Sequence, residues 1–168
     1  MSLSRPASAC GSLLPGPYVP DPFEEHVPAT DEAVRLAVSA ADAADDKKAT
    51  DLAILEVADL MALVDVFLLV STSTARQLKA VAEHVEFKLR DRHDRRPLRR
   101  EGTAEAGWVL LDYGDLVCHV FTAEQRGFYA LERLWADVPR RDPTSGEVVA
   151  ASVAVGVGAG GGADEAGA

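Results

Sequence analysis

Cysteine is scarce in this chain of 168 residues, which holds two, Cys10 and Cys118. One falls in a predicted tail and the other in a predicted strand, so they supply neither a disulfide framework nor a metal site, and a reducing cytoplasm fits. No run of about 18 apolar residues occurs, and we expect no membrane span. Pro6, Gly11 and Ser12 interrupt the apolar core that an export signal needs, and we expect no such signal. These absences predict a cytoplasmic protein.

Charge and composition divide the chain into three parts. The net charge of −10 argues against general nucleic-acid binding and favours a basic partner. Residues 1–29 hold six of the nine prolines, and the residues from Gly146 onward hold seven of the thirteen glycines and no aromatic residue. We therefore predict a disordered Pro-rich extension at 1–29, one folded domain at 30–139 and a disordered Gly/Ala-rich tail at 140–168.

Helix caps and hydrophobic runs predict the elements of the domain. Thr74 with Gln77 forms a capping box before a clear apolar helical stripe. The nearly continuous apolar run at 64–70 predicts a central strand covered on both faces. The expected fold class is α/β, a small mixed β-sheet flanked by helices. In chain order we expect a helix from Thr30, strands at 51–57 and 64–70, a helix from Thr74, two strands around the turn at 112–115, and a helix from Thr122 that folds back through Phe128, Leu131 and Trp135.

The stretch 108–121 organises the rest of the chain, because it reads as a β-hairpin. A two-residue loop at Tyr113-Gly114 places Trp108 opposite His119. The pleat then gives one apolar face for the core, namely Val109, Leu111, Leu116, Cys118 and Val120. The other face mixes an indole, aliphatic groups, carboxylates and an imidazole, which suits a binding surface; its residues are Trp108, Leu110, Asp112, Asp115, Val117 and His119.

The sequence shows no convincing catalytic or metal-binding constellation. Asp112 and Asp115 flank the turn, but aspartate is a favoured turn residue and no third carboxylate stands at suitable spacing. The run 71–74 precedes a helix but lacks the glycines and lysine of a phosphate-binding loop. No strand carries the alternating acids of a nucleotidyltransferase, and no nucleophile shares the face of His119. We therefore predict a protein that is not an enzyme and holds no metal or cofactor.

A basic run from Arg90 to Arg100 stands out in this acidic chain. It contains six Arg and two Asp, and Pro97 interrupts any helix there, so we expect a loop. The arginines could contact RNA phosphates, although no aromatic residue is interleaved for base stacking. A solvated loop explains the run equally well, and the sequence leaves both interpretations open.

A set of short motifs in the predicted domain matches a known pattern. The motifs are Ser73-Thr74-Ala75-Arg76-Gln77, Glu101-Gly102, Trp108 to Asp115, His119-Val120-Phe121, Phe128-Tyr129 and Leu131 to Trp135. In order and spacing they resemble the ribosomal silencing factor family, also called the Iojap-like family. The similarity covers about Thr30 to Ala136, and both ends of the chain fall outside it.

The resemblance implies a function that composition does not show. Proteins of that family bind the large ribosomal subunit through a protein at the intersubunit face, block joining of the small subunit, and so repress translation when nutrients are scarce. Their fold resembles nucleotidyltransferases without the catalytic acids. The resemblance assigns partner contacts to Trp108, Tyr113 and Asp115. The mixed face of the predicted hairpin adds Leu110, Val117 and His119 to these expected contacts.

Several alternatives stay open at this stage. A large-subunit assembly factor would share the same surface, and an orphan nucleotidyltransferase-like enzyme would use the run 71–74. The hairpin allows self-association, so either a monomer or a homodimer is compatible with the sequence. The basic run Arg90 to Arg100 adds a possible local contact with ribosomal RNA, which would offset the repulsion between an acidic protein and the ribosome.

Overall fold

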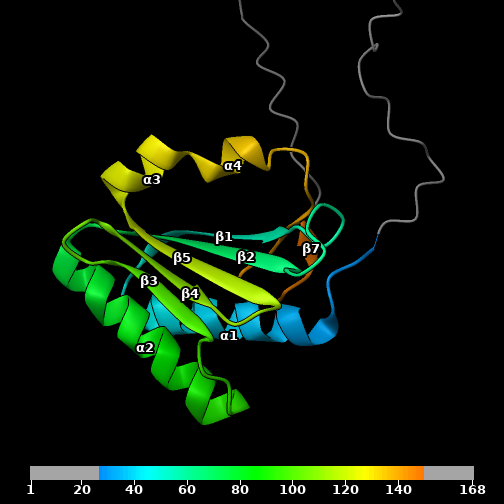
Figure 1. Cartoon of the computed structure of the whole chain (residues 1–168), viewed down its shortest axis with the longest axis horizontal. Helices are drawn as coiled ribbons and strands as arrows, with labels where there is room; N and C mark the ends of the chain where they lie inside the picture. Colours follow the sequence, from blue (N-terminus) through cyan, green and yellow to red (C-terminus); the bar gives the residue numbers. More distant parts are fainter. Residues whose placement is uncertain (1–26, 150–168) are drawn as a thin grey trace, which may run out of the picture.

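The computed structural model describes residues 27–149 and builds them around one seven-stranded sheet (Figure 1). Residues 1–26 and 150–168, which include Cys10 and most of both predicted tails, lie outside the described residues. The predicted α/β class, a mixed sheet flanked by helices, is confirmed. The elements are α1 Asp31–Asp46, β1 Thr50–Glu56, β2 Val66–Thr72, α2 Ala75–His93, β3 Arg99–Thr103, β4 Trp108–Asp112, β5 Leu116–Thr122, α3 Ala123–Tyr129, α4 Leu131–Leu134, β6 Arg140–Arg141 and β7 Val148–Val149.

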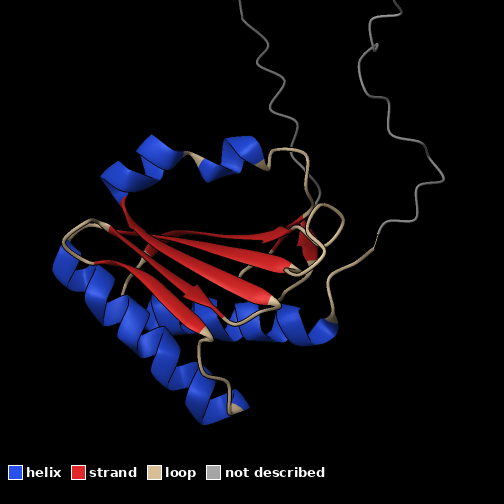
Figure 2. Ribbon diagram, viewed as in Figure 1, coloured by secondary structure: helices blue, strands red, loops and turns tan. Residues whose placement is uncertain are grey.

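The sheet runs in the order β3-β4-β5-β2-β1-β6-β7 (Figure 2). Within the described sheet, β2 and β5 pair in parallel, and every other neighbouring pair is antiparallel. All seven residues of β2 are buried, as its apolar run predicts. In this order the hairpin strands β4 and β5 lie between the central strand β2 and the edge strand β3.

The main core lies between the sheet and the helices α1 and α2, which cover one face of it (Figure 1). Alanine dominates the buried side of α1, and these small side chains let the helix approach its neighbours closely. The hairpin face that the sequence assigns to the core is confirmed, because its five residues are all buried in this cluster; they are Val109, Leu111, Leu116, Cys118 and Val120.

Threonine caps fix the starts of three helices, as the sequence predicts. In each, the threonine hydroxyl oxygen accepts a hydrogen bond from a backbone N–H one turn into the helix, satisfying a donor that the helix itself leaves unpaired. The pairs are Ala33 N to Thr30 at 3.3 Å, Gln77 N to Thr74 at 3.1 Å and Gln125 N to Thr122 at 3.4 Å.

The segment from Arg90 to Arg100 is not the loop that the sequence predicts. Helix α2 continues through His93, and β3 starts at Arg99, leaving a short connection around Pro97. Strand β3 lies at the edge of the sheet, and all five of its residues are exposed. Its sequence therefore lacks the alternation of apolar and polar residues by which a strand is predicted.

The folded region also extends past both predicted boundaries of the domain, 30 and 139. At the start, the Ala29 N–H donates to the buried carboxylate of Glu56 on β1. At the end, β6 pairs with β1, and Arg141 Nε lies 3.0 Å from Glu56 Oε2. Strands of two residues are too short to leave a period in the sequence, which explains why the predicted tail at 140–168 starts too early.

The helix predicted after Thr122 is broken at Ala130, which has a φ of 44° and separates α3 from α4. Leu131 and Trp135 pack against the sheet as expected. Phe128 was expected to do the same, and this is wrong: the break turns it outward, and it is 78% exposed.

Candidate docking surface

The hairpin has the predicted faces but a different register. Trp108 pairs with Phe121, and His119 pairs with Leu110 instead of Trp108. The turn centres on Gly114, whose φ is 93°, and Asp115, one residue later than predicted, because the Tyr113 N–H donates to the Leu116 carbonyl at 2.8 Å. The register differs by two residues, an even number, so the side chains within the strands keep their predicted faces. Asp115, in the turn, instead reaches Arg95, which also contacts α1.

The second face of the sheet is only partly roofed. Helices α3 and α4 lie over it, opposite α1 and α2 (Figure 1), and neither contains a buried residue. Beneath them is a small apolar cluster of Leu55, Val57, Phe67, Leu69, Val117, Phe121 and Val138. Trp108 and Leu110 of β4 are half-buried at its margin. This margin is where the second face meets solvent.

His119 lies inside an aromatic cluster on this face. Its ring is stacked on Trp108, with centroids 6.3 Å apart, and meets Phe67 edge-on at 5.4 Å. The Trp108 Nε1–H donates to His119 Nδ1 at 3.4 Å, a long hydrogen bond. Burial lowers the pKa of His119 to about 4, so the imidazole is neutral at physiological pH.

Tyr129 and Phe128 extend the cluster to the surface. The Tyr129 ring lies 6.1 Å from Trp108 and 5.9 Å from Phe121, and it is 48% exposed. Phe128 meets Tyr129 edge-on at 5.3 Å. We call the four accessible side chains Trp108, Leu110, Phe128 and Tyr129 the aromatic face. Exposed aromatic side chains gathered in one patch are typical of protein–protein contacts.

Comparison with known proteins assigns a family to this geometry. The profile of the family described as "Ribosomal silencing factor during starvation" matches residues 30–155. The chain belongs to this family. It is 38% identical over 103 residues to the ribosomal silencing factor RsfS of Bacillus subtilis, covering 61% of this chain and 86% of that protein. It is 34% identical over 122 residues to the chloroplastic protein Iojap of Zea mays, covering 70% and 50%.

Solved structures agree with the family assignment. A protein from Chromobacterium violaceum superposes with a TM-score of 0.59 at 31% identity, covering 62% of this chain and 86% of that one. A protein from Bacillus halodurans gives 0.56 at 34% identity, covering 67% and 99%. The resemblance to ribosomal silencing factors drawn from the sequence is therefore confirmed, whereas likeness to nucleotidyltransferases stays a prediction.

The predicted partner-binding residues lie at different places in the structure. Trp108 and Leu110 lie on the aromatic face. Val117 and His119 lie beneath it, buried. Tyr113 points to the opposite side, into the core under α2, where burial raises the pKa of its hydroxyl. The side chains of Tyr113, Val117 and His119 are all buried, so their predicted contacts with a partner stay predictions that would need the surface to open.

Asp115 has a partner within the protein. Arg95 Nη2 lies 2.6 Å from its carboxylate, and the same guanidinium group contacts Glu32 of α1 at 2.9 Å and the Tyr113 carbonyl at 2.9 Å. Asp115 thus ties the hairpin turn to α1 and to the end of α2. Its predicted contact with a basic partner would have to compete with Arg95.

Sequence reasoning missed Phe128 and Tyr129 as parts of the candidate site. Their exposure depends on the left-handed conformation of Ala130. A glycine at that position would have signalled the break, but alanine does not. The motif Phe128-Tyr129 within the ribosomal silencing factor resemblance was the available signal, since it marks two aromatic residues whose burial no periodicity requires.

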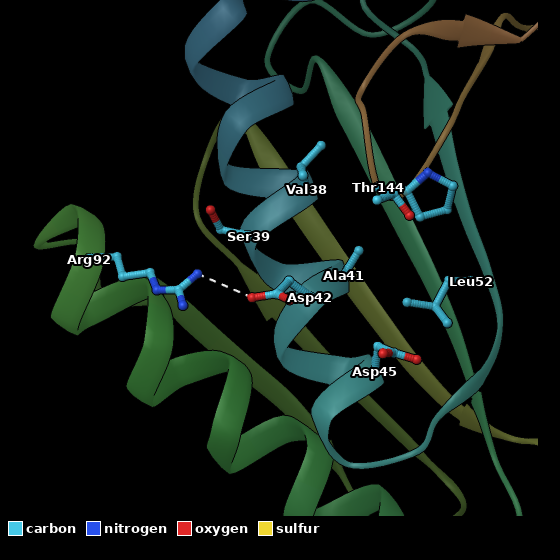
Figure 3. A pocket seen from close by; sticks show the side chains of 9 residues that line it. Val38, Ser39, Ala41, Asp42, Asp45, Leu52, Arg92 and Thr144 are labelled. Atoms are coloured by element: carbon cyan, nitrogen blue, oxygen red, sulfur yellow. Dashed lines mark hydrogen bonds and ion pairs between the residues drawn. The ribbon is translucent and has the colours of Figure 1, made fainter.

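A hollow of about 520 Å³ lies beside α1 (Figure 3), apart from the aromatic face. Val38, Ala41 and Leu52 line it, and the turn at Pro143 and Thr144 borders it. The carboxylate of Asp42 is engaged by Lys88 at 2.8 Å and by Arg92 at 3.1 Å, and these contacts, chiefly the one from Lys88, lower the pKa of Asp42. The hollow is a seam between α1 and the β6–β7 turn.

Two further features are absent from the described part of the chain. Residues 27–149 contain no group of three His, Cys, Asp or Glu side chains placed to hold a metal ion. None of the helices within these residues is both long and apolar enough to cross a membrane.

The buried His119 makes the stability of this protein depend on pH. In the unfolded chain His119 titrates near pH 6.5, and in the folded protein near 4. Between these two pH values the unfolded chain binds a proton that the folded protein does not. The contribution of His119 to the free energy of unfolding is therefore complete above pH 6.5 and is lost as pH falls through 4, by up to about 3 kcal/mol. In urea titrations from pH 7 to pH 4, the wild type should lose more stability than His119→Phe, in which acids such as Asp42 titrate unchanged. Parallel curves for the two proteins would contradict this.

Proposed function

We propose that this protein represses translation under nutrient limitation by binding the large ribosomal subunit and sterically blocking its joining to the small subunit. The proposed contact is a ribosomal protein at the intersubunit face. Membership of the ribosomal silencing factor family supports the ribosome as the target. The aromatic face is the single structural observation that carries the proposal, because it is an accessible apolar patch on the side of the sheet that α1 and α2 leave free.

The physical properties of the aromatic face suit such a contact. Trp108 is held by stacking on His119 and Phe121, so little side-chain entropy is lost when a partner covers it. Tryptophan and tyrosine are the residues most often found as interface anchors. The net charge of −10 would steer the domain toward a basic ribosomal protein and chiefly raise the association rate.

A subunit-joining assay tests this proposal. Purified large subunits are incubated with the protein before small subunits are added, and joined ribosomes are followed by light scattering and sucrose-gradient sedimentation. We expect the protein to sediment with large subunits and to reduce joining in proportion to its occupancy. Addition after joining should have a smaller effect, which serves as the control.

Two results of this assay would contradict the proposal. Sedimentation with large subunits but undiminished joining would exclude a steric block. Binding confined to immature large subunits would favour the assembly-factor alternative. The number of protein copies per large subunit in the gradient fractions distinguishes a bound monomer from a bound homodimer, both of which the sequence allows. A local contact between Arg90–Arg100 and ribosomal RNA also belongs to the proposal.

A further inference from the structure

The structure sorts the arginines of the basic run into two sets. One set is engaged in ion pairs within the protein. In contrast, Arg90 and Arg96 are exposed, and no acidic side chain within residues 27–149 pairs with either guanidinium group. As far as residues 27–149 are concerned, these two cations are available to an external anion. The engaged pairs are Arg92–Asp42 at 3.1 Å, Arg95–Asp115 at 2.6 Å, Arg99–Glu101 at 3.6 Å and Arg100–Glu86 at 2.7 Å.

The two free arginines border a groove that also contains an aromatic ring. The groove measures about 400 Å³ and lies between the last turns of α2 and the connection to β3. Phe87 lines it, 51% exposed and stacked on His84 with centroids 6.2 Å apart and planes inclined by 15°. The basic run itself lacks interleaved aromatics, but the helix places Phe87 one turn before Arg90 and so supplies one. The groove is lined by Glu83, Glu86, Phe87, Arg90, Arg96 and Pro97.

We propose that this groove binds single-stranded RNA, with a base stacked on Phe87 and backbone phosphates at Arg90 and Arg96. The inference rests on the ribosomal RNA contact in the proposed function and specifies its form. An exposed ring beside cations that track a phosphate backbone is the arrangement by which proteins hold single strands. The bases of duplex RNA are stacked on one another and unavailable to Phe87.

The acidic residues of the groove favour RNA over an acidic peptide. Glu83 is exposed, with Lys79 at 4.0 Å, and Glu86 is paired with Arg100. Their carboxylates repel RNA phosphates and peptide carboxylates alike, but they also accept hydrogen bonds from base amino groups, which an acidic side chain does not offer. The groove is lined from α2, and the aromatic face includes Phe128 and Tyr129 of α3. Figure 1 shows α2 and α3 on opposite sides of the sheet. One molecule therefore has separate surfaces for a ribosomal protein and for RNA.

Binding of RNA to the isolated protein should be weak and dependent on salt. The net charge of −10 opposes association, and the described lining of the groove contains two guanidinium groups, those of Arg90 and Arg96. For about two phosphate contacts on a single strand, affinity should fall roughly sevenfold between about 50 and 200 mM salt.

Fluorescence anisotropy with the full chain and a labelled unstructured RNA of about 12 nucleotides tests the proposal. We expect Phe87→Ala to weaken binding about tenfold, and Arg90→Ala with Arg96→Ala to weaken it at least as much and to flatten the salt dependence. Arg76→Ala removes an exposed arginine at the other end of α2 and should have little effect. The altered side chains are exposed, and thermal unfolding verifies that each variant is folded.

Three outcomes would overturn the RNA groove: equal loss of binding in Arg76→Ala, duplex RNA binding as tightly as the single strand, or a labelled polyglutamate peptide binding as tightly. The failures of the two proposals are distinguishable. If RNA does not bind while subunit joining is still blocked, the groove and the ribosomal RNA contact fail, and the steric block of joining stands. If RNA binds in the predicted way and joining is unaffected, only the proposed function fails.

Discussion

Replacing Trp108 by alanine is expected to weaken binding to large ribosomal subunits by at least about thirtyfold, the effect typical of an interface anchor. The indole is the central side chain of the aromatic face and connects Tyr129 to the buried ring of His119. Its removal takes away both contact area and the support of its neighbours. Co-sedimentation over a range of protein concentrations measures the loss.

Trp108→Ala needs a matched control, because the indole also packs against the small cluster under α3 and α4. Leu63→Ala shortens an apolar side chain that is 86% exposed in the β1–β2 connection, and it should leave subunit binding unchanged. Circular dichroism and urea unfolding should show that Trp108→Ala is folded. Wild-type levels of Trp108→Ala on large subunits would refute the assignment of the aromatic face.

Replacing Glu56 by alanine is expected to cost about 3 kcal/mol of unfolding free energy, the largest loss of stability that we predict. The carboxylate is 2% exposed, accepts from the Ala29 N–H and pairs with Arg141 Nε at 3.0 Å. Its removal leaves a largely buried guanidinium group and a buried N–H without their shared partner. Urea denaturation of the variant and the wild type measures the difference.

A double-mutant cycle separates this effect from simple loss of a side chain. Glu56→Ala with Arg141→Ala should lose less stability than the sum of the two single variants, because neither charge is then left alone. Glu105→Ala removes an exposed carboxylate and should change stability by less than about 0.5 kcal/mol. Additive losses in the cycle would show that the pair does not couple the ends of the domain.

The sequence predicts best where a feature is local. The threonine caps depend on residues three apart, and the two faces of the hairpin depend on alternation alone. The register was wrong by two residues, because Tyr113-Gly114 is a weak turn signal and the pairing of Tyr113 with Leu116 is decided in the folded sheet. A shift of two residues leaves the strand side chains on the correct faces, but it changes which residues pair across the two strands.

Features that depend on distant residues could not be predicted. The partners of Arg95 come from α1 and from the hairpin turn, so the sequence treated Asp115 as free. Strand β3 is entirely exposed, and the exposure of Phe128 depends on one left-handed residue, Ala130. The sequence therefore indicates Trp108 and Leu110 as surface contacts, and the Phe128-Tyr129 motif is its one pointer to α3 beside them.

The basic end of the molecule affects how it would approach a polyanion. The segment from Arg90 to Arg100 holds six Arg and two Asp, so the rest of the chain carries a charge of −14 against +4 there. In the folded protein, carboxylates pair with four of these arginines, so Arg90 and Arg96 supply most of the positive charge at this end. The molecule is thus a modest electric dipole as well as an anion. In the field of a nucleic acid it experiences a torque that turns the end of α2 toward the phosphates while the bulk is repelled. Orientation would thus be selected before contact, and the approach would grow less selective as salt screens the field.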